Sequence, residues 1–419
     1  MRKTAPAIHP LQNIEFISPK IYDITHDVKL FWMSEVADET AHLEFHFDAG
    51  TIQGEPSLAG FVNALLLSGT AEKSSTQIQD ELSDLGAYID VEIGQELAIV
   101  SLFCLRQYLE QAVDIVADAL ENLSFIEHEV DDMLREKKQA YLVSTEKVSI
   151  LSRRAFQTQM FSNSERYGRI MKPTDFDKVS IPELKRFHKE YYLKGLTKIV
   201  LTANVNVAYI DRLIDVAGAW SRDKNFDFEK DFVNTTGTIH VEKEGAVQTA
   251  IRMGIQLFNK THEDFLDFQV LQTIFGDYFG SRLMSNIRED KGYTYGIGCG
   301  VSESHETGYF IIATEVGKEV AEATLKEIKF EMYRLQSDPV GEVELALVKN
   351  YLLGQILKSA DGPDSMMSLF MGAEMHGKGY EYYNEAIESV KNVTAERLQQ
   401  LAQKYLVWDN FTIITAGEK

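Results

Sequence analysis

The sequence has little cysteine, a deficit of positive charge and no long apolar run. Only Cys104 and Cys299 occur among 419 residues, too few for a disulfide framework and typical of a reducing compartment. No stretch approaches the roughly 18 consecutive apolar residues that a membrane-spanning helix needs. The 42 Lys and Arg residues against 64 Asp and Glu leave a net charge of −22, which disfavours nucleic acid and anionic membranes as partners.

Other features of the composition are ordinary. Apolar residues at 44% and charged residues at 25% exclude wholesale disorder, and the length allows two or three domains. The first residues are basic but have no apolar segment behind them, so we expect no secretory signal. We therefore expect a cytoplasmic protein.

The chain repeats itself at about half its length. Tyr192 and Tyr405 each end a helical pattern that an apolar strand follows, and they lie 213 residues apart (405 − 192). Amphipathic helical patterns around Leu134 and Leu347 have the same spacing (347 − 134 = 213). A unit of roughly 200 residues is therefore predicted to occur twice.

Each half has a similar order of expected elements. Strands are predicted at 41–47 and 248–257, followed by helices at 57–67 and 264–275. Strands and helices do not alternate strictly farther along. The pattern predicts an α+β fold of two homologous repeats, each a mainly antiparallel sheet with helices packed on one face.

A polar segment marks the expected boundary between the two repeats. Residues 221–238 carry charges of both signs and have no sustained hydrophobic period. We predict an N-terminal repeat at 1–225, a linker at 226–238 and a C-terminal repeat at 239–419.

A helix–strand corner in the second half carries the most informative chemistry. Ser281 is predicted to cap a helix that Gly292 ends in the left-handed conformation, with Arg288 in the last turn. The guanidinium of Arg288 and the phenol of Tyr295, in the next strand, could converge on one peptide carbonyl. On the residues alone, Arg288 could instead complement its helix C-terminus, and Tyr295 could be a strand residue with a hydrated hydroxyl.

The strand after this corner is predicted to have one bare face. Strand alternation places Tyr295 and Ile297 on one face and Gly296, Gly298 and Gly300 on the other. A face without side chains would let a helix or a ligand backbone approach closely.

This stretch resembles the C-terminal half of the pitrilysin/insulinase family of zinc metallopeptidases, in particular its processing-peptidase-like bacterial branch. The family pattern Ser-Arg-Leu, then Arg-Glu-x-x-Gly-x-x-Tyr, is matched by 281–283 and by Arg288 to Tyr295. The resemblance covers nearly the whole chain and implies the processing-peptidase-like metallohydrolase fold. It also implies that Arg288 and Tyr295 are the family's substrate-binding pair.

The family's zinc motif is degenerate in the first half. The motif H-x-x-E-H supplies two imidazole ligands and a Glu that activates metal-bound water. The matching positions are Gly60, Asn63 and Ala64. Gly and Ala have no donor side chain, and an Asn amide cannot take a proton from water near neutral pH. The later carboxylate ligand is expected near 139–143, where none occurs, and Glu146 is the nearest downstream.

We therefore expect no metal and no other cofactor on this chain, and no peptidase activity when it is alone. The resemblance implies a division of labour in one branch of the family, in which one subunit carries the zinc and the other the Arg/Tyr pair. This chain fits a non-catalytic, substrate-binding subunit that supplies Arg288 and Tyr295 to a homologous zinc-bearing partner and takes unfolded peptide. The alternative is a peptide-binding or structural scaffold, for example a homodimer, with no peptidase role.

The predicted strand at 41–47 carries residues that could form a different metal site. His42, Glu44 and His46 lie on one face of a predicted strand and form a two-His, one-carboxylate set. The alternative is the polar face of a half-buried strand whose other residues, such as Leu43 and Phe45, pack inward.

Overall fold

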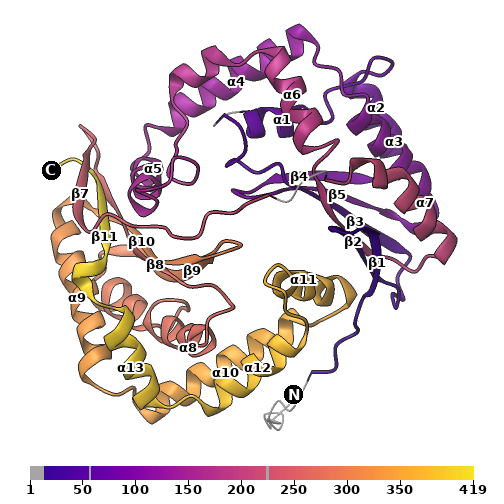
Figure 1. Ribbon diagram of the computed structural model, residues 1–419. Coiled ribbons are helices and arrows are strands. Elements are labelled where there is room, and N and C mark those ends of the chain that lie inside the picture. The colour runs from indigo at the N-terminus through magenta and orange to yellow at the C-terminus, as the bar shows by residue number, and fades with distance from the viewer. Residues whose placement is uncertain (1–13, 56–57, 223–225) are drawn as a thin grey trace, which may run out of the picture.

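The computed structural model describes residues 14–55, 58–222 and 226–419. The chain folds into two halves, each built on one sheet, with helices forming most of the outer layer (Figure 1). The predicted boundary at residue 225 and the first residue of the predicted helix 57–67 lie outside the described residues. In the described part of the chain, no helix is long and apolar enough to cross a membrane.

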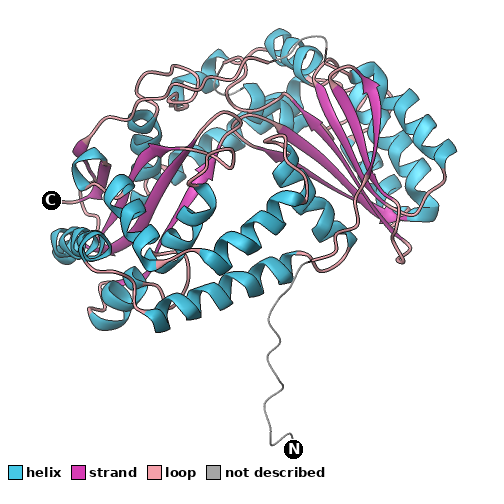
Figure 2. Ribbon diagram, turned by 60° about the horizontal axis from the view of Figure 1, so that its bottom comes forward, coloured by secondary structure: helices cyan, strands magenta, loops and turns pink. Residues whose placement is uncertain are grey.

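The strands form two sheets that Figure 2 shows as separate blocks. The first sheet contains β1 (Lys20–Thr25), β2 (Val28–Met33), β3 (Thr40–Phe47), β4 (Tyr88–Ile93), β5 (Ala98–Leu105) and β6 (Leu196–Thr202). The second contains β7 (Gly237–Glu242), β8 (Gln248–Leu257), β9 (Thr294–Glu303), β10 (Gly308–Gly317) and β11 (Thr412–Gly417).

The two sheets share one topology. Their strand orders are β1-β2-β6-β3-β5-β4 and β7-β11-β8-β10-β9, which are equivalent once β1 is set aside. The pairs β2–β6 and β7–β11 are parallel, and every other neighbouring pair in these two sheets is antiparallel. The predicted duplication and the mainly antiparallel α+β fold are confirmed.

The helices follow the same duplication. The first half contributes α1 (Leu58–Leu65), α2 (Ser75–Asp84), α3 (Leu109–Glu121), α4 (Glu127–Ser144), α5 (Val148–Met160), α6 (Ile181–Tyr191) and α7 (Val207–Ala217). The second contributes α8 (Phe265–Phe275), α9 (Ala321–Ser337), α10 (Glu342–Ser359), α11 (Pro363–Glu374), α12 (Glu381–Asn392) and α13 (Ala395–Tyr405).

Strand alternation divides each sheet between two cores. On β2, Leu30 packs into the large core beneath the helices of the first half, whereas its neighbour Phe31 faces the opposite side. On β10, Phe310 likewise packs against the helices of the second half, and Ile311 faces the opposite side. The predicted helical layer on one face of each sheet is therefore present.

The two halves exchange one helix each. Phe156 and Met160 of α5 pack on the inner face of the second sheet, with Ile414 of β11. Met367 of α11 packs on the inner face of the first sheet, with Phe31. Because α5 and α11 hold equivalent places in the two repeats, each half covers part of the other's sheet. The halves consequently share buried apolar surface.

The predicted linker is anchored to α5 where it is described. The N–H of Ser162 donates to the carbonyl of Val233 at 3.0 Å, and that of Thr235 donates to the carbonyl of Gln159 at 2.8 Å. Phe232 packs into the core around α5. The segment after α5 and the connection between the halves are thus held together.

Candidate functional site

The corner that carries Arg288 begins with a capped helix. The hydroxyl of Ser281 accepts the N–H of Met284 at 3.4 Å, and its carbonyl accepts the N–H of Ser285 at 2.9 Å. The helix then widens into a π-helix, η4 (Met284–Asp290), a form that is frequent at functional sites. Gly292 ends it with φ of +66°, as its position in the sequence predicts.

Tyr295 stands on a β-bulge at the start of β9. Thr314 of β10 faces Ile297 and Val316 faces Thr294, so two residues of β9, Tyr295 and Gly296, oppose one residue of β10. Ile297 is buried, whereas Tyr295 is 95% exposed. The predicted common face of Tyr295 and Ile297 is wrong, because the extra residue interrupts the alternation.

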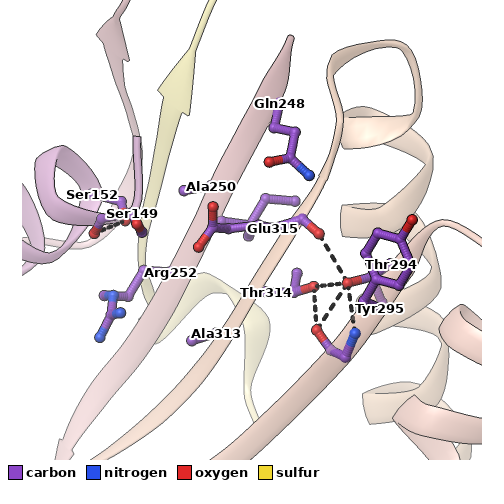
Figure 3. Close-up of a pocket in the computed structure, with 12 residues that line it drawn as sticks. Ser149, Ser152, Gln248, Ala250, Arg252, Thr294, Tyr295, Ala313, Thr314 and Glu315 are labelled. Carbon is purple, nitrogen blue, oxygen red and sulfur yellow. Dashed lines mark hydrogen bonds between the residues drawn. The ribbon is translucent and has the colours of Figure 1, made fainter. Parts of the chain in front are cut away.

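Two threonine hydroxyls hold this bulge in place (Figure 3). Thr294 Oγ1 accepts the N–H of Gly296 at 3.0 Å, and it lies 2.9 Å from the carbonyl oxygen of Glu315. Thr314 Oγ1 lies 2.9 Å both from Thr294 Oγ1 and from the carbonyl oxygen of Gly296. The backbone of Tyr295 is thereby fixed while its phenol remains in solvent.

The guanidinium of Arg288, on the other side of the corner, makes few contacts with other side chains. Its guanidinium carbon lies 4.5 Å from the ring centroid of the exposed Phe279, a cation–π contact. Its Nη1 lies 3.1 Å from Glu289 Oε1 but forms no hydrogen bond within the described chain, although it is buried. Because the ion pair with Glu289 does not have hydrogen-bond geometry, this atom can still donate to a ligand carbonyl.

A cavity of about 400 Å³ opens beside Tyr295 on the inner face of the second sheet. Its lining comes from the first turns of α5 and from β8, β9 and β10. Figure 3 shows Tyr295 and Thr294 on one side, Arg252 with the serines of α5 on the other, and the carboxylate of Glu315 between them. Arg288 is not part of this lining. The structure therefore brings Tyr295, but not Arg288, to the cavity.

The bare strip of β9 also faces this side of the sheet. Gly298 pairs with Ala313 and Gly300 with Ile311, on the face opposite the buried Ile312. No atom of the described chain lies within 4 Å of the position that a Cβ would take on Gly300. Gly300 thus leaves room that the described residues do not fill, whereas the carbonyl oxygen of Gly276 lies 3.8 Å from the Cβ position of Gly298.

The positions that the resemblance predicts for a degenerate zinc motif, Gly60, Asn63 and Ala64, lie on α1. Gly60 and Ala64 lie one turn apart, with open space around Gly60 and with Ala64 exposed. Asn63 is buried, and its Nδ2 donates to the carbonyl of Glu92 and to the hydroxyl of Tyr192, both at 3.3 Å. Its amide serves packing between elements. The residues present do not fit a zinc ion.

Glu146, the nearest carboxylate after the expected ligand position, forms an ion pair with Lys243 of the second half. Within residues 14–55, 58–222 and 226–419, no group of three or more His, Cys, Asp or Glu side chains is arranged to hold a metal ion.

The histidines of β3 form an ion-pair network. His46 Nε2 lies 2.7 Å from Glu44 Oε2, and His42 Nε2 lies 3.2 Å from Glu44 Oε1. His42 Nδ1 lies 3.5 Å from Asp364 Oδ1 on α11. Leu43 and Phe45 pack inward as the alternation predicts. These polar side chains therefore link β3 to the exchanged helix α11.

Burial disfavours the charged forms of His42 and Glu44, but the effect of their polar contacts on the two pKa values is larger. Hydrogen bonds to Asp364 and Glu44 raise the pKa of His42 to about 9, and the two histidines lower the pKa of Glu44 to about 2. His42 and Glu44 are therefore both charged at neutral pH.

Sequence reasoning missed Arg252 and Glu315. Arg252 is a lone cation in the middle of β8, between Ile251 and Met253, and such an interruption of an apolar strand was the available signal. The bulge gave no signal, because its two threonines are ordinary strand residues.

Comparison with known proteins gives consistent matches. Residues 33–174 match the family model "Insulinase (Peptidase family M16)", and residues 178–352 match the model "Peptidase M16 inactive domain". An uncharacterized zinc protease of Bacillus subtilis, YmxG, is 21% identical over 358 residues, covering 84% of this chain and 86% of its own. The mitochondrial-processing peptidase subunit beta of Rattus norvegicus is 23% identical over 389 residues, covering 86% and 76%.

Solved structures match over nearly the whole length. A peptidase M16 inactive domain from Pseudomonas fluorescens superposes with a TM-score of 0.87 at 20% identity, covering 96% of this chain and 99% of its own. A protease from Helicobacter pylori superposes with a TM-score of 0.80 at 13% identity, covering 96% and 100%. At these identities the two structures establish the fold.

Proposed function

Because the chain belongs to the pitrilysin/insulinase family of zinc metallopeptidases, we propose that it is the non-catalytic, substrate-binding subunit of a heteromeric zinc endopeptidase. A homologous partner with an intact H-x-x-E-H motif carries the zinc, which supplies Lewis-acid activation of water. This chain supplies Arg288 and Tyr295 to the unfolded peptide.

One observation carries the proposal. The Arg288–Tyr295 corner presents an exposed phenol and a guanidinium whose Nη1 is paired only with the neighbouring Glu289 in the described residues, whereas α1 of the same chain has Gly60, Asn63 and Ala64 at the motif positions. The name of one relative, a processing-peptidase subunit, also supports a division of labour between chains.

We assign a separate role to each side chain of the pair. The phenol of Tyr295 donates its O–H to the oxygen of the scissile carbonyl, where negative charge develops in the transition state. Because the bulge fixes its backbone, little reorganisation accompanies the reaction. Nη1 of Arg288 donates to a neighbouring peptide carbonyl and holds the extended substrate in register.

Reconstitution with the zinc-bearing partner tests this role. We expect Tyr295→Phe to lower kcat by roughly 10²–10³-fold with little change in KM, because an oxyanion donor acts mainly in the transition state. The measurement is steady-state peptide hydrolysis by the purified pair of chains. Tyr333→Phe, which alters another exposed tyrosine on α9, is the matched control and should leave kcat unchanged.

An unchanged kcat for Tyr295→Phe would remove this residue from the mechanism. Failure of the chain to form a complex with a zinc-bearing homologue would favour the second candidate, a peptide-binding scaffold that assembles with copies of itself. The apolar surface shared between the two halves suits either role.

A further inference from the structure

The lining of the cavity beside Tyr295 includes a cation, Arg252, that forms no ion pair with the described residues. Arg252 projects from β8 into the lining, and its Nε is buried without a hydrogen-bond partner in the described residues. Figure 3 shows its guanidinium with no dashed contact to the other side chains drawn. A buried N–H without an acceptor is costly to the folded state.

The surroundings of Arg252 add positive charge. Burial lowers the pKa of Arg252, and the guanidinium of Arg153 on α5 lowers it further. Tyr309 and Glu315 act in the opposite direction but do not compensate. Glu315 is exposed and forms no ion pair with Arg252 in the part of the chain that is described. The Arg252 side of the cavity therefore attracts an anion.

The cavity also has the size and position for part of a peptide. Its volume of about 400 Å³ is within the range of pockets that hold small ligands. Tyr295, proposed above to contact the scissile carbonyl, lies on its rim, and the hydroxyl of Ser149 can add a donor opposite the sheet. A residue bound here would lie close to the cleaved bond.

We propose that Arg252 binds a carboxylate of the peptide substrate, so that this cavity selects acidic peptides. The carboxylate belongs to an Asp or Glu side chain or to the peptide's C-terminus, and Arg252 holds it through charge-assisted hydrogen bonds. Arg153 strengthens the field, and Glu315 limits it. This inference rests on the proposed peptide-binding function.

Binding of labelled peptides to the purified chain tests the proposal. Three fluorescein-labelled ten-residue peptides of otherwise neutral sequence are compared by anisotropy: one with a central Glu and an amidated C-terminus, one with Gln and an amidated C-terminus, and one with Gln and a free C-terminus. Arg252→Gln should lower the affinity for the preferred acidic peptide by roughly 10–100-fold, the effect expected for loss of a charged hydrogen bond.

Glu315→Gln should have the opposite effect and increase the affinity for the same peptide by roughly 2–5-fold, because it removes an exposed negative charge that repels the peptide carboxylate. The neutral peptide should respond to neither change. Arg135→Gln on α4, which alters net charge equally but lies outside the cavity, is the matched control. The two acidic peptides distinguish a side-chain from a C-terminal carboxylate.

The possible results separate this inference from the proposed function. Peptides that bind through Arg288 and Tyr295, shown by weakening in Arg288→Gln and Tyr295→Phe, but with no preference for carboxylates, would overturn the inference alone. A carboxylate preference that depends on Arg252 but not on Arg288 or Tyr295 would support the inference and contradict the proposed function. Absence of binding by all three peptides would contradict both.

Discussion

At the scale of single residues, Asn63 makes structural contacts at a position where the family resemblance predicts a catalytic glutamate. Its amide joins α1 to the carbonyl of Glu92 and the buried hydroxyl of Tyr192. We expect Asn63→Ala to lower the free energy of unfolding by about 1–2 kcal/mol, because two buried polar groups lose a partner. Urea denaturation of the purified chain measures the change.

Asn122→Ala is the matched control, since Asn122 follows α3 and makes an exposed side-chain bond to Asp118. It should change the same quantity by no more than about 0.5 kcal/mol. Equal effects of the two substitutions would show that the contacts of Asn63 contribute nothing particular to stability.

At the scale of elements, an ionisable side chain, His42, links α11 to the first sheet. His42 contacts Asp364 of α11, stacks on Phe103 with ring centroids 4.0 Å apart, and has its pKa raised from 6.5 to about 9. A raised pKa means that the folded state favours the protonated form. Its stabilisation is complete below pH 6.5 and is lost as the pH rises through 9.

We expect the thermal stability of the chain to fall between pH 6.5 and 9 by an amount on the order of 2 kcal/mol that His42→Gln abolishes. Scanning calorimetry across this range measures it. His26→Gln, which alters an exposed histidine on the turn between β1 and β2, should keep the wild-type pH dependence. A wild-type profile that His42→Gln leaves unaltered would contradict the assigned pairing.

At the scale of the whole molecule, the sequence predicts the duplication and the fold class but not how the halves engage. The repeat of Tyr192 at Tyr405 reflects local patterns that each half needs for its own core. The exchange of α5 and α11 depends on contacts between residues far apart in the chain, such as Phe156 with the second sheet, and no local period encodes it.

The candidate site divides in the same way. The corner at Ser281 and Gly292 could be predicted, because capping and left-handed glycine are local effects. The bulge at Tyr295 could not, since it depends on register against β10. The cavity lies between α5 and the strands β8, β9 and β10. The position of Arg252 in its lining therefore depends on tertiary contacts and could not be predicted from the sequence.

We propose above all that this chain binds peptide but does not carry the zinc that peptide hydrolysis requires. Metal analysis and peptide hydrolysis by the highly purified chain alone, with and without a chelator, test this claim most directly. We expect no stoichiometric zinc and no chelator-sensitive hydrolysis. Stoichiometric zinc together with hydrolysis that a chelator abolishes would contradict it.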